Sequence, residues 1–138
     1  MGKTTGEPGL FVSAPVVEAG RVIGVVAVKV RMEPISDPWA QLRDPVFVTD
    51  EQGIVFLGSV PDWLYRTSRP LPTPLVQQLQ HNEQYGTGWA PRAVPWTLRP
   101  QDDSPGAELR LDGPGGKRYL AFEEKLPDLG WTLSLIHI

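Results

Sequence analysis

Hydrophobic residues occur in short stretches separated by Gly, Pro and Asp, a pattern typical of β-strands joined by turns. The first two stretches cover residues 10–17 and 21–31 and flank a short turn at 18–20. The second stretch is rich in valine, and β-branched residues favour strands. The sequence therefore predicts that the chain begins with a β-hairpin.

A second group of elements follows a proline-rich segment at residues 34–38, where we predict a domain boundary. Pro38 can occupy the first position of a short helix. Residues 45–50 and 54–59 then predict a pair of strands around a tight turn, in which Gly53 supplies a positive φ. The aromatic and basic segment 62–69 is predicted to be partly helical.

Residues 73–85 carry the strongest helical pattern, with apolar residues at spacings of three and four. Thr73 can cap this helix, and Pro74 suits its first position. Four predicted strands follow, at residues 96–98, 108–111, 118–125 and 131–138. A strand pair, a helix and further antiparallel strands predict an α+β fold of the PAS-like kind, in which helices pack on one antiparallel sheet.

Composition narrows the classes of function. The 13 Lys and Arg residues are outnumbered by 16 Asp and Glu residues, so the net charge is -3 and nucleic acid is not an expected partner. No apolar run is long enough to cross a bilayer. Cysteine is absent, which excludes disulfides and thiolate metal sites and favours an oxidising compartment.

Residue types that carry catalysis are scarce. His81 and His137 do not share a metal-ligand spacing, and no serine lies in a G-x-S-x-G motif. Glu123 and Glu124 are neighbours on a predicted strand, so their side chains point to opposite faces and cannot act as an acid and base pair. We therefore expect no enzyme activity, no cofactor and no metal site.

Lys29 interrupts the most apolar predicted strand. Alternation places it on the same face as Ala27 and Arg31, opposite Val28 and Val30. A cation on a concave sheet face can bind a carboxylate through a charge-assisted hydrogen bond, and a hydroxyl from Ser13 can assist it. The alternative is a lysine that protects a strand edge or extends to water.

A cluster of aromatic and basic residues comprises Trp63, Tyr65, Arg66 and Arg69. In one interpretation these residues line the core and their guanidinium groups bind carboxylates or backbone carbonyls of the same domain. A second small-anion pocket is the alternative. Stacking on nucleic acid is disfavoured by the acidic balance of the chain.

Several stretches, taken in order, resemble the periplasmic region of the dicarboxylate-transport sensor histidine kinases. They are GLFVSAPV at 9–16, GVVAVKV at 24–30, Trp39, VTDEQGIVFL at 48–57, WLYRTSRPL at 63–71 and LPDLGWTL at 126–133. The resemblance covers nearly the whole chain. It implies a double Cache module, which consists of two PAS-like domains in tandem.

The resemblance implies that residues 1–33 form the closing hairpin of a truncated membrane-distal domain. Residues 34–138 then form the membrane-proximal Cache domain. The kinase core lies outside this chain, so we expect a periplasmic sensing fragment without catalytic residues. Membrane attachment is expected through segments outside the chain, and the intact receptor is expected to be a homodimer.

The family resemblance also implies a ligand set. Lys29 matches a lysine on the closing strand that holds a carboxylate of succinate or a similar four-carbon acid. Ser13, Phe11 and Thr5 are carried over with it as ligand contacts. The alternative function is a structural and dimerisation module of a membrane receptor, such as a chemoreceptor or cyclase, that binds nothing. Lacking its partner strands, the hairpin is expected to pair with a second copy, dock on the following sheet or lack order.

Overall fold

The chain was analysed as a computed structural model that describes residues 9–100, 106–111 and 117–137. The first part is a hairpin of β1 (Gly9–Glu18) and β2 (Arg21–Arg31). The second part is a six-stranded sheet with all neighbours antiparallel and the strand order β4-β3-β8-β7-β6-β5. Its strands are β3 (Val46–Thr49), β4 (Val55–Gly58), β5 (Trp96–Pro100), β6 (Gly106–Leu111), β7 (Arg118–Leu126) and β8 (Trp131–His137).

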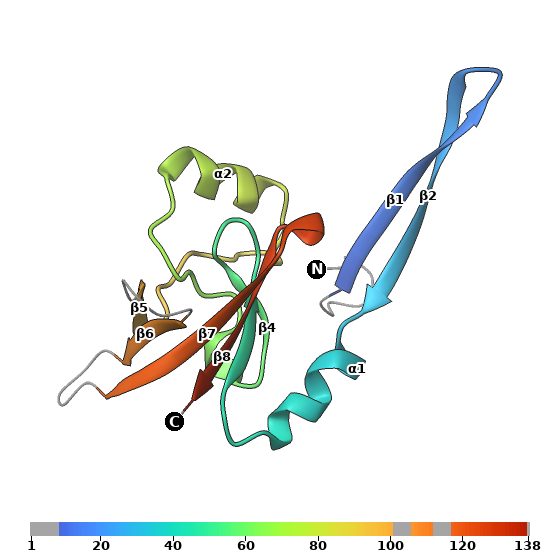
Figure 1. The fold of residues 1–138 in the computed structure, drawn as a ribbon. Helices are drawn as coiled ribbons and strands as arrows, with labels where there is room; N and C mark the ends of the chain where they lie inside the picture. Colours follow the sequence, from blue (N-terminus) through green and yellow to red (C-terminus); the bar gives the residue numbers. More distant parts are fainter. Residues whose placement is uncertain (1–8, 101–105, 112–116, 138) are drawn as a thin grey trace.

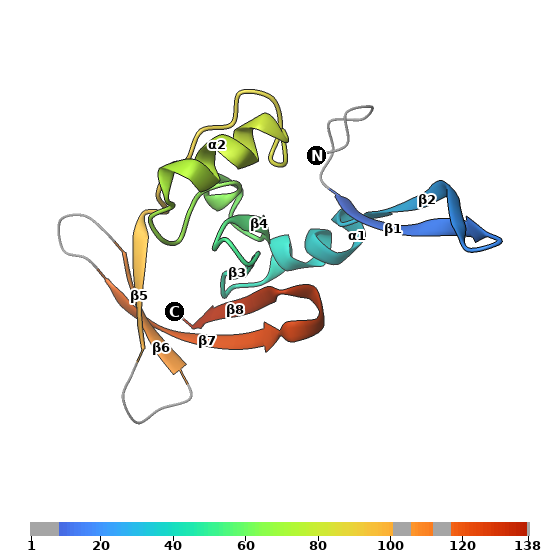
Figure 2. The same cartoon turned by 90° about the horizontal axis from the view of Figure 1, so that it is seen from above.

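Short helices connect the strands. They are α1 (Glu33–Ser36), the 3-10 turns η1 (Asp37–Gln41), η2 (Pro61–Trp63) and η3 (Pro127–Leu129), and the longest helix, α2 (Thr73–His81). Figure 1 shows the hairpin projecting away from the sheet, with α1 at its base. Figure 2 shows α2 on the β4 side of the sheet, away from β7. The α+β antiparallel architecture predicted from the sequence is confirmed.

Strand β3 is buried on both faces of the sheet, because its alternating residues pack into two different core clusters. Phe47 points into the largest core cluster and makes ring contacts with Trp63 and Trp96, at centroid distances of 5.8 and 5.0 Å. Its neighbour Val48 belongs to a second cluster on the other face, with Met32 of the junction. The second cluster therefore holds the base of the hairpin against the sheet.

A third cluster attaches α2. Leu79 of the helix is buried with Ile54 and Tyr85, and Leu75 packs against them. The helix is shorter than the pattern predicts, because it ends at His81 and not near residue 85. Pro72 occupies the N-cap position and no side chain caps the helix, so the cap predicted for Thr73 is wrong.

The segment 62–69 is helical only at its start, in the single turn η2, so the prediction of a partly helical segment holds only for residues 62–63. Tyr65 N donates to Val55 O, and Thr67 N donates to Arg92 O at 2.8 Å. These backbone hydrogen bonds to other parts of the chain replace those of a helix. Tertiary pairing overrides local helix propensity here.

Candidate functional site

Lys29 lies on β2 directly opposite Phe11 of β1. Directly paired residues of antiparallel strands project to the same face, and so do residues two apart on one strand. Ser13, which pairs with Ala27, therefore shares this face with Phe11 and Lys29. The structure thus brings three of the four predicted ligand residues onto one face. Thr5 lies outside the described residues.

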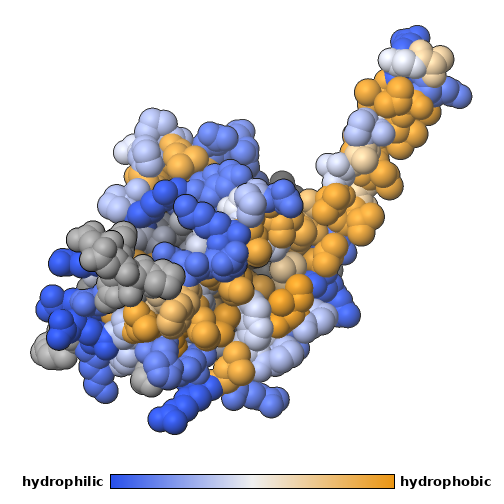
Figure 3. All heavy atoms as spheres, viewed as in Figure 1, coloured by the Kyte–Doolittle hydropathy of each residue, from blue (hydrophilic) through white to orange (hydrophobic). Residues whose placement is uncertain are grey.

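The other face of the hairpin is apolar along its length. The paired residues there are Leu10 with Val30, Val12 with Val28, and Ala14 with Val26. Val12 and Val28 are 55% and 58% exposed. Figure 3 shows this projection as a largely hydrophobic surface. Contiguous exposed apolar surface is rare on soluble proteins and is typical of interaction surfaces.

The base of the hairpin contacts the sheet domain, and the rest of it does not lie on the sheet (Figure 1). Leu10 packs against the cluster that contains Met32 and Val48. The alternative in which the hairpin docks on the following sheet is therefore wrong, because the hydrophobic contacts stop at the junction. The two hairpin strands remain paired with each other from Gly9 to Glu18.

The arginines of the aromatic and basic segment bind backbone carbonyls, as the first interpretation predicted. Arg69 donates from Nε to Gln52 O at 3.0 Å and from Nη2 to Glu51 O. Arg66 donates from Nη1 to Ala93 O at 3.4 Å. Trp63 is buried in the main core cluster. This segment therefore ties the β3–β4 turn and the segment before β5 to the sheet.

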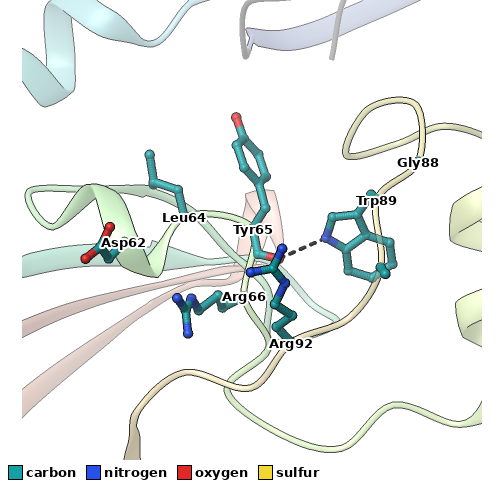
Figure 4. Close-up of a pocket in the computed structure, with 8 residues that line it drawn as sticks. Asp62, Leu64, Tyr65, Arg66, Gly88, Trp89 and Arg92 are labelled. Atoms are coloured by element: carbon teal, nitrogen blue, oxygen red, sulfur yellow. Dashed lines mark hydrogen bonds between the residues drawn. The ribbon is translucent and has the colours of Figure 1, made fainter.

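The same segment also lines a pocket of about 340 Å³, shown in Figure 4. Its wall includes Arg66 and Tyr65 from this segment and Trp89 and Arg92 from the segment before β5, with Asp62 and Leu64 beside them. Trp89 Nε1 donates to Tyr65 O at 2.9 Å, which fixes the indole at the pocket wall. Sequence reasoning missed Trp89 and Arg92, because residues 89–104 have no clear period.

Tyr65 has an unusual backbone conformation, with a φ of 61°. A bulky residue in this region is strained unless surrounding contacts hold it. Burial raises the pKa of the Tyr65 hydroxyl, and the nearby Glu33 carboxylate raises it further. Both effects favour the neutral hydroxyl of Tyr65.

The remaining candidate groups form no catalytic arrangement within the described parts of the chain. His81 is exposed, and His137 Nδ1 lies 3.2 Å from Asp44 Oδ2. Glu123 pairs with Ser134 whereas Glu124 pairs with Leu133, so the two carboxylates face opposite sides as predicted. Over residues 9–100, 106–111 and 117–137, no three acidic or histidine side chains gather as metal ligands, and no helix is both long and apolar enough to cross a bilayer.

Comparison with curated proteins finds two relatives of the same description. The chain is 28% identical over 138 residues to the C4-dicarboxylate transport sensor protein DctB of Rhizobium meliloti. It is 31% identical over 135 residues to the protein of that name from Pseudomonas aeruginosa. These matches cover 97% and 98% of this chain but only 22% and 19% of the relatives. No family model matches the chain.

Comparison with solved structures also finds domains of bacterial receptors. The sensor domain of the Vibrio cholerae histidine kinase DctB superposes with a TM-score of 0.80 at 23% identity, covering 98% of this chain and 52% of that chain. The ligand-binding domain of the Pseudomonas aeruginosa chemoreceptor PctC, in complex with GABA, superposes with a TM-score of 0.56 at 21% identity, covering 98% and 51%. This chain therefore shares its fold with these two domains, and it spans about half of each solved domain.

Proposed function

From the homology of this chain to the sensor region of the C4-dicarboxylate transport sensor proteins, we propose that it helps such a receptor to detect a four-carbon dicarboxylate. The localisation that follows from this homology is periplasmic. The chain spans about a fifth of the curated relatives, so the kinase activity belongs to the longer protein and not to these residues.

In this proposal, residues 1–33 belong to a membrane-distal domain and residues 34–138 form the membrane-proximal domain. The observation that carries the proposal is the shared face of Phe11, Ser13 and Lys29 on a hairpin with few contacts to the sheet domain. A two-stranded ribbon with both faces exposed is marginally stable alone. Strands supplied by the rest of the distal domain would cover it and enclose the ligand face.

The chemistry of this face suits a carboxylate. The Lys29 ammonium can form a charge-assisted hydrogen bond with one ligand carboxylate, and the Ser13 hydroxyl can donate a neutral one. Phe11 lies directly opposite Lys29 and supplies an apolar surface for the methylene carbons of the ligand. Thr5 is proposed as a further hydroxyl contact from the residues before β1.

Signal relay follows from the connection between the two parts. The hairpin leads through Met32 directly into α1, and Met32 is buried against β3 and β4. A ligand that draws the hairpin toward the distal domain would therefore act on the sheet domain through this junction. We propose that the sheet domain transmits this change toward the membrane and the kinase of a homodimeric receptor.

The alternative is a structural and dimerisation module that binds no ligand. The feature that favours it is the exposed apolar face of the hairpin, which suits a second copy of the chain as well as a distal domain. In that case the hairpin face that carries Lys29 would bind no ligand, and Lys29 would protect a strand edge.

Calorimetric titration of succinate into the complete sensor region tests the proposal. The expected result is stoichiometric binding together with thermal stabilisation that grows with succinate concentration, because a ligand that binds the native state shifts the unfolding equilibrium. Absence of binding by succinate, fumarate and malate would favour the structural module. The same succinate titration with this 138-residue chain tests the proximal domain by itself. In the proposal, residues 1–33 supply only part of the distal pocket.

A further inference from the structure

We propose that the pocket between the segment 62–66 and the segment 88–92 is a second binding site, and that it takes a small monocarboxylate. It lies in the sheet domain and not on the hairpin, so it is separate from the face that carries Lys29. The argument rests on the position of two arginines, on their hydrogen-bonding capacity and on the rigidity of the wall.

An isolated parallel bridge positions the two arginines. Thr67 pairs with Ala93 in this bridge, so Arg66 and Arg92, which precede them, occupy neighbouring positions on the two segments. Thr67 N donates to Arg92 O at 2.8 Å, and Val94 N donates to Thr67 O at 3.0 Å. Both arginines line the same pocket. Figure 4 shows Arg92 extending toward the contact between Tyr65 and Trp89, and Arg66 extending toward Asp62.

The two guanidinium groups retain most of their donors. Each has five N–H donors in a planar arrangement that matches a carboxylate. Arg66 uses one on the carbonyl of Ala93. Within the part of the chain that the structure describes, Arg92 contributes its backbone carbonyl to the bridge, and its guanidinium has no hydrogen bond or ion pair. Two arginines with one carboxylate, that of Asp62, leave the pocket with an excess of positive charge.

The wall is already organised for a ligand. Tyr65 is held at its positive φ by a hydrogen bond to Val55 O, and its own carbonyl accepts from the indole of Trp89. Trp89 also packs against Tyr85, with ring centroids 4.9 Å apart. Strained residues that are fixed in this way cluster at ligand sites. A preformed wall reduces the ordering cost of binding.

The size and charge of the pocket select the ligand. A volume of about 340 Å³ lies at the small end of the range for ligand pockets. The positive charges of Arg66 and Arg92 favour an anionic ligand, and Trp89 and Leu64 offer apolar surface for a short carbon chain. The Asp62 carboxylate disfavours a second negative charge on the ligand, so a monocarboxylate fits better than succinate.

Acetate is the probe for the test, in the full 138-residue chain labelled with ¹⁵N. The indole N–H resonance of Trp89, identified by its loss in Trp89→Phe, reports on the pocket wall. We expect acetate to shift this resonance saturably. Arg92→Gln and Arg66→Gln should weaken the acetate affinity on the order of ten- to a hundred-fold, the effect of losing a charge-assisted hydrogen bond. Asp62→Asn should strengthen succinate binding.

Two control variants separate this site from general charge. Arg43→Gln removes an exposed arginine outside the pocket, and Lys29→Met removes the proposed distal contact. Neither should alter the acetate affinity. The proposal is overturned if acetate leaves the Trp89 resonance unmoved, if Arg43→Gln weakens binding as much as Arg92→Gln, or if inorganic phosphate binds as tightly as acetate. Since Lys29→Met is a control here, failure of this site is distinguishable from failure of succinate sensing.

Discussion

The hydroxyl of Tyr85 donates a hydrogen bond to Oδ2 of Asp50, which joins the loop after α2 to the turn between β3 and β4. The other oxygen of the same carboxylate accepts hydrogen bonds from the backbone N–H groups of Gln52 and Ile54, each at 3.0 Å. One side chain therefore organises the turn and anchors the helical layer. Burial and the contact with Asp50 raise the pKa of Tyr85 far above its usual range.

Tyr85→Phe should lower the free energy of unfolding by about 1.5–3 kcal/mol, because it removes a hydrogen bond to a charged acceptor and leaves the Asp50 oxygen without that donor. Urea unfolding followed by tryptophan fluorescence measures the change. Tyr119→Phe is the matched control: Tyr119 packs against the main core cluster, and its hydroxyl has no hydrogen bond within the described residues. Equal effects of the two variants would show that the bond to Asp50 contributes nothing.

Stability should fall at alkaline pH. The folded-state pKa of Tyr85 is raised. The contribution of Tyr85 to the free energy of unfolding is therefore complete below a pH of about 10 and is lost as the pH rises above that value. The unfolded chain then binds fewer protons than the native chain, which gives a slope of at most about 1.4 kcal/mol per pH unit for one group. Urea midpoints at several pH values above and below 10 measure it. Tyr85→Phe should flatten the slope, and an unchanged slope would contradict the assignment.

Gly53→Ala should destabilise the sheet domain by more than about 1 kcal/mol, because the position combines strain with crowding. Gly53 has a φ of 79°, and an added Cβ would lie 2.7 Å from the Oγ of Ser68. That hydroxyl donates to Gly53 O at 2.7 Å, so the contact cannot relax without losing the bond. Gly88→Ala is the control, because its φ is 75° with nothing within 4 Å. Chemical denaturation should show a smaller loss for Gly88→Ala.

Replacement of Lys29 tests the distal ligand site. In the complete sensor region, Lys29→Ala should weaken succinate binding on the order of ten- to a hundred-fold through loss of a charge-assisted hydrogen bond worth about 1.5–3 kcal/mol. Lys29→Met keeps much of the apolar stem, so it separates charge from packing. The fold should survive both changes, because Val28 and Val30 project to the opposite face. Unchanged affinity by calorimetry in both variants would return Lys29 to the role of an edge lysine.

The exposed hairpin should make this chain associate. Val26 and Val28 are 54% and 58% exposed on a ribbon whose outer edges are unpaired within the described chain. Sedimentation velocity should therefore show an average mass that rises with protein concentration. Val26→Lys should reduce association, whereas Gln77→Lys on the exposed side of α2 adds the same charge elsewhere and should not. A monomer at every concentration would exclude hairpin pairing.

The strands were predictable because their patterns are local. Alternation around Gly53 gave β3 and β4, and the valine-rich segment gave the hairpin to within a residue or two. The early end of α2 and the short helical turn in the segment 62–69 share a physical cause, which is competition from distant partners. Residues 82–85 leave the helical pattern where Tyr85 bonds to Asp50, and residues 64–67 extend to pair with β4 and with the segment before β5.

The two candidate sites also differ in how far local sequence patterns could predict them. Lys29 was identifiable because a charge in an apolar strand stands out in the sequence. Phe11 and Ser13 were proposed from the family resemblance, and the register of the hairpin places them on the same face as Lys29. The pocket of Arg66 and Arg92 was only half visible, because Arg92 lies in an aperiodic segment and reaches the pocket through the Thr67–Ala93 bridge. Tertiary contacts create that site.

The position of β8 between β3 and β7 has a consequence for synthesis on the ribosome. Val46 of β3 pairs with Leu135 of β8. Strand β3 is synthesised early, and it gains its second neighbour in the sheet only after β8, the last described strand, has been synthesised. Closing so long a stretch of chain slows folding. Until then β3 and β4 form only a nascent hairpin with unpaired backbone groups, and a polypeptide interrupted before β8 would present that edge to other chains or to a chaperone.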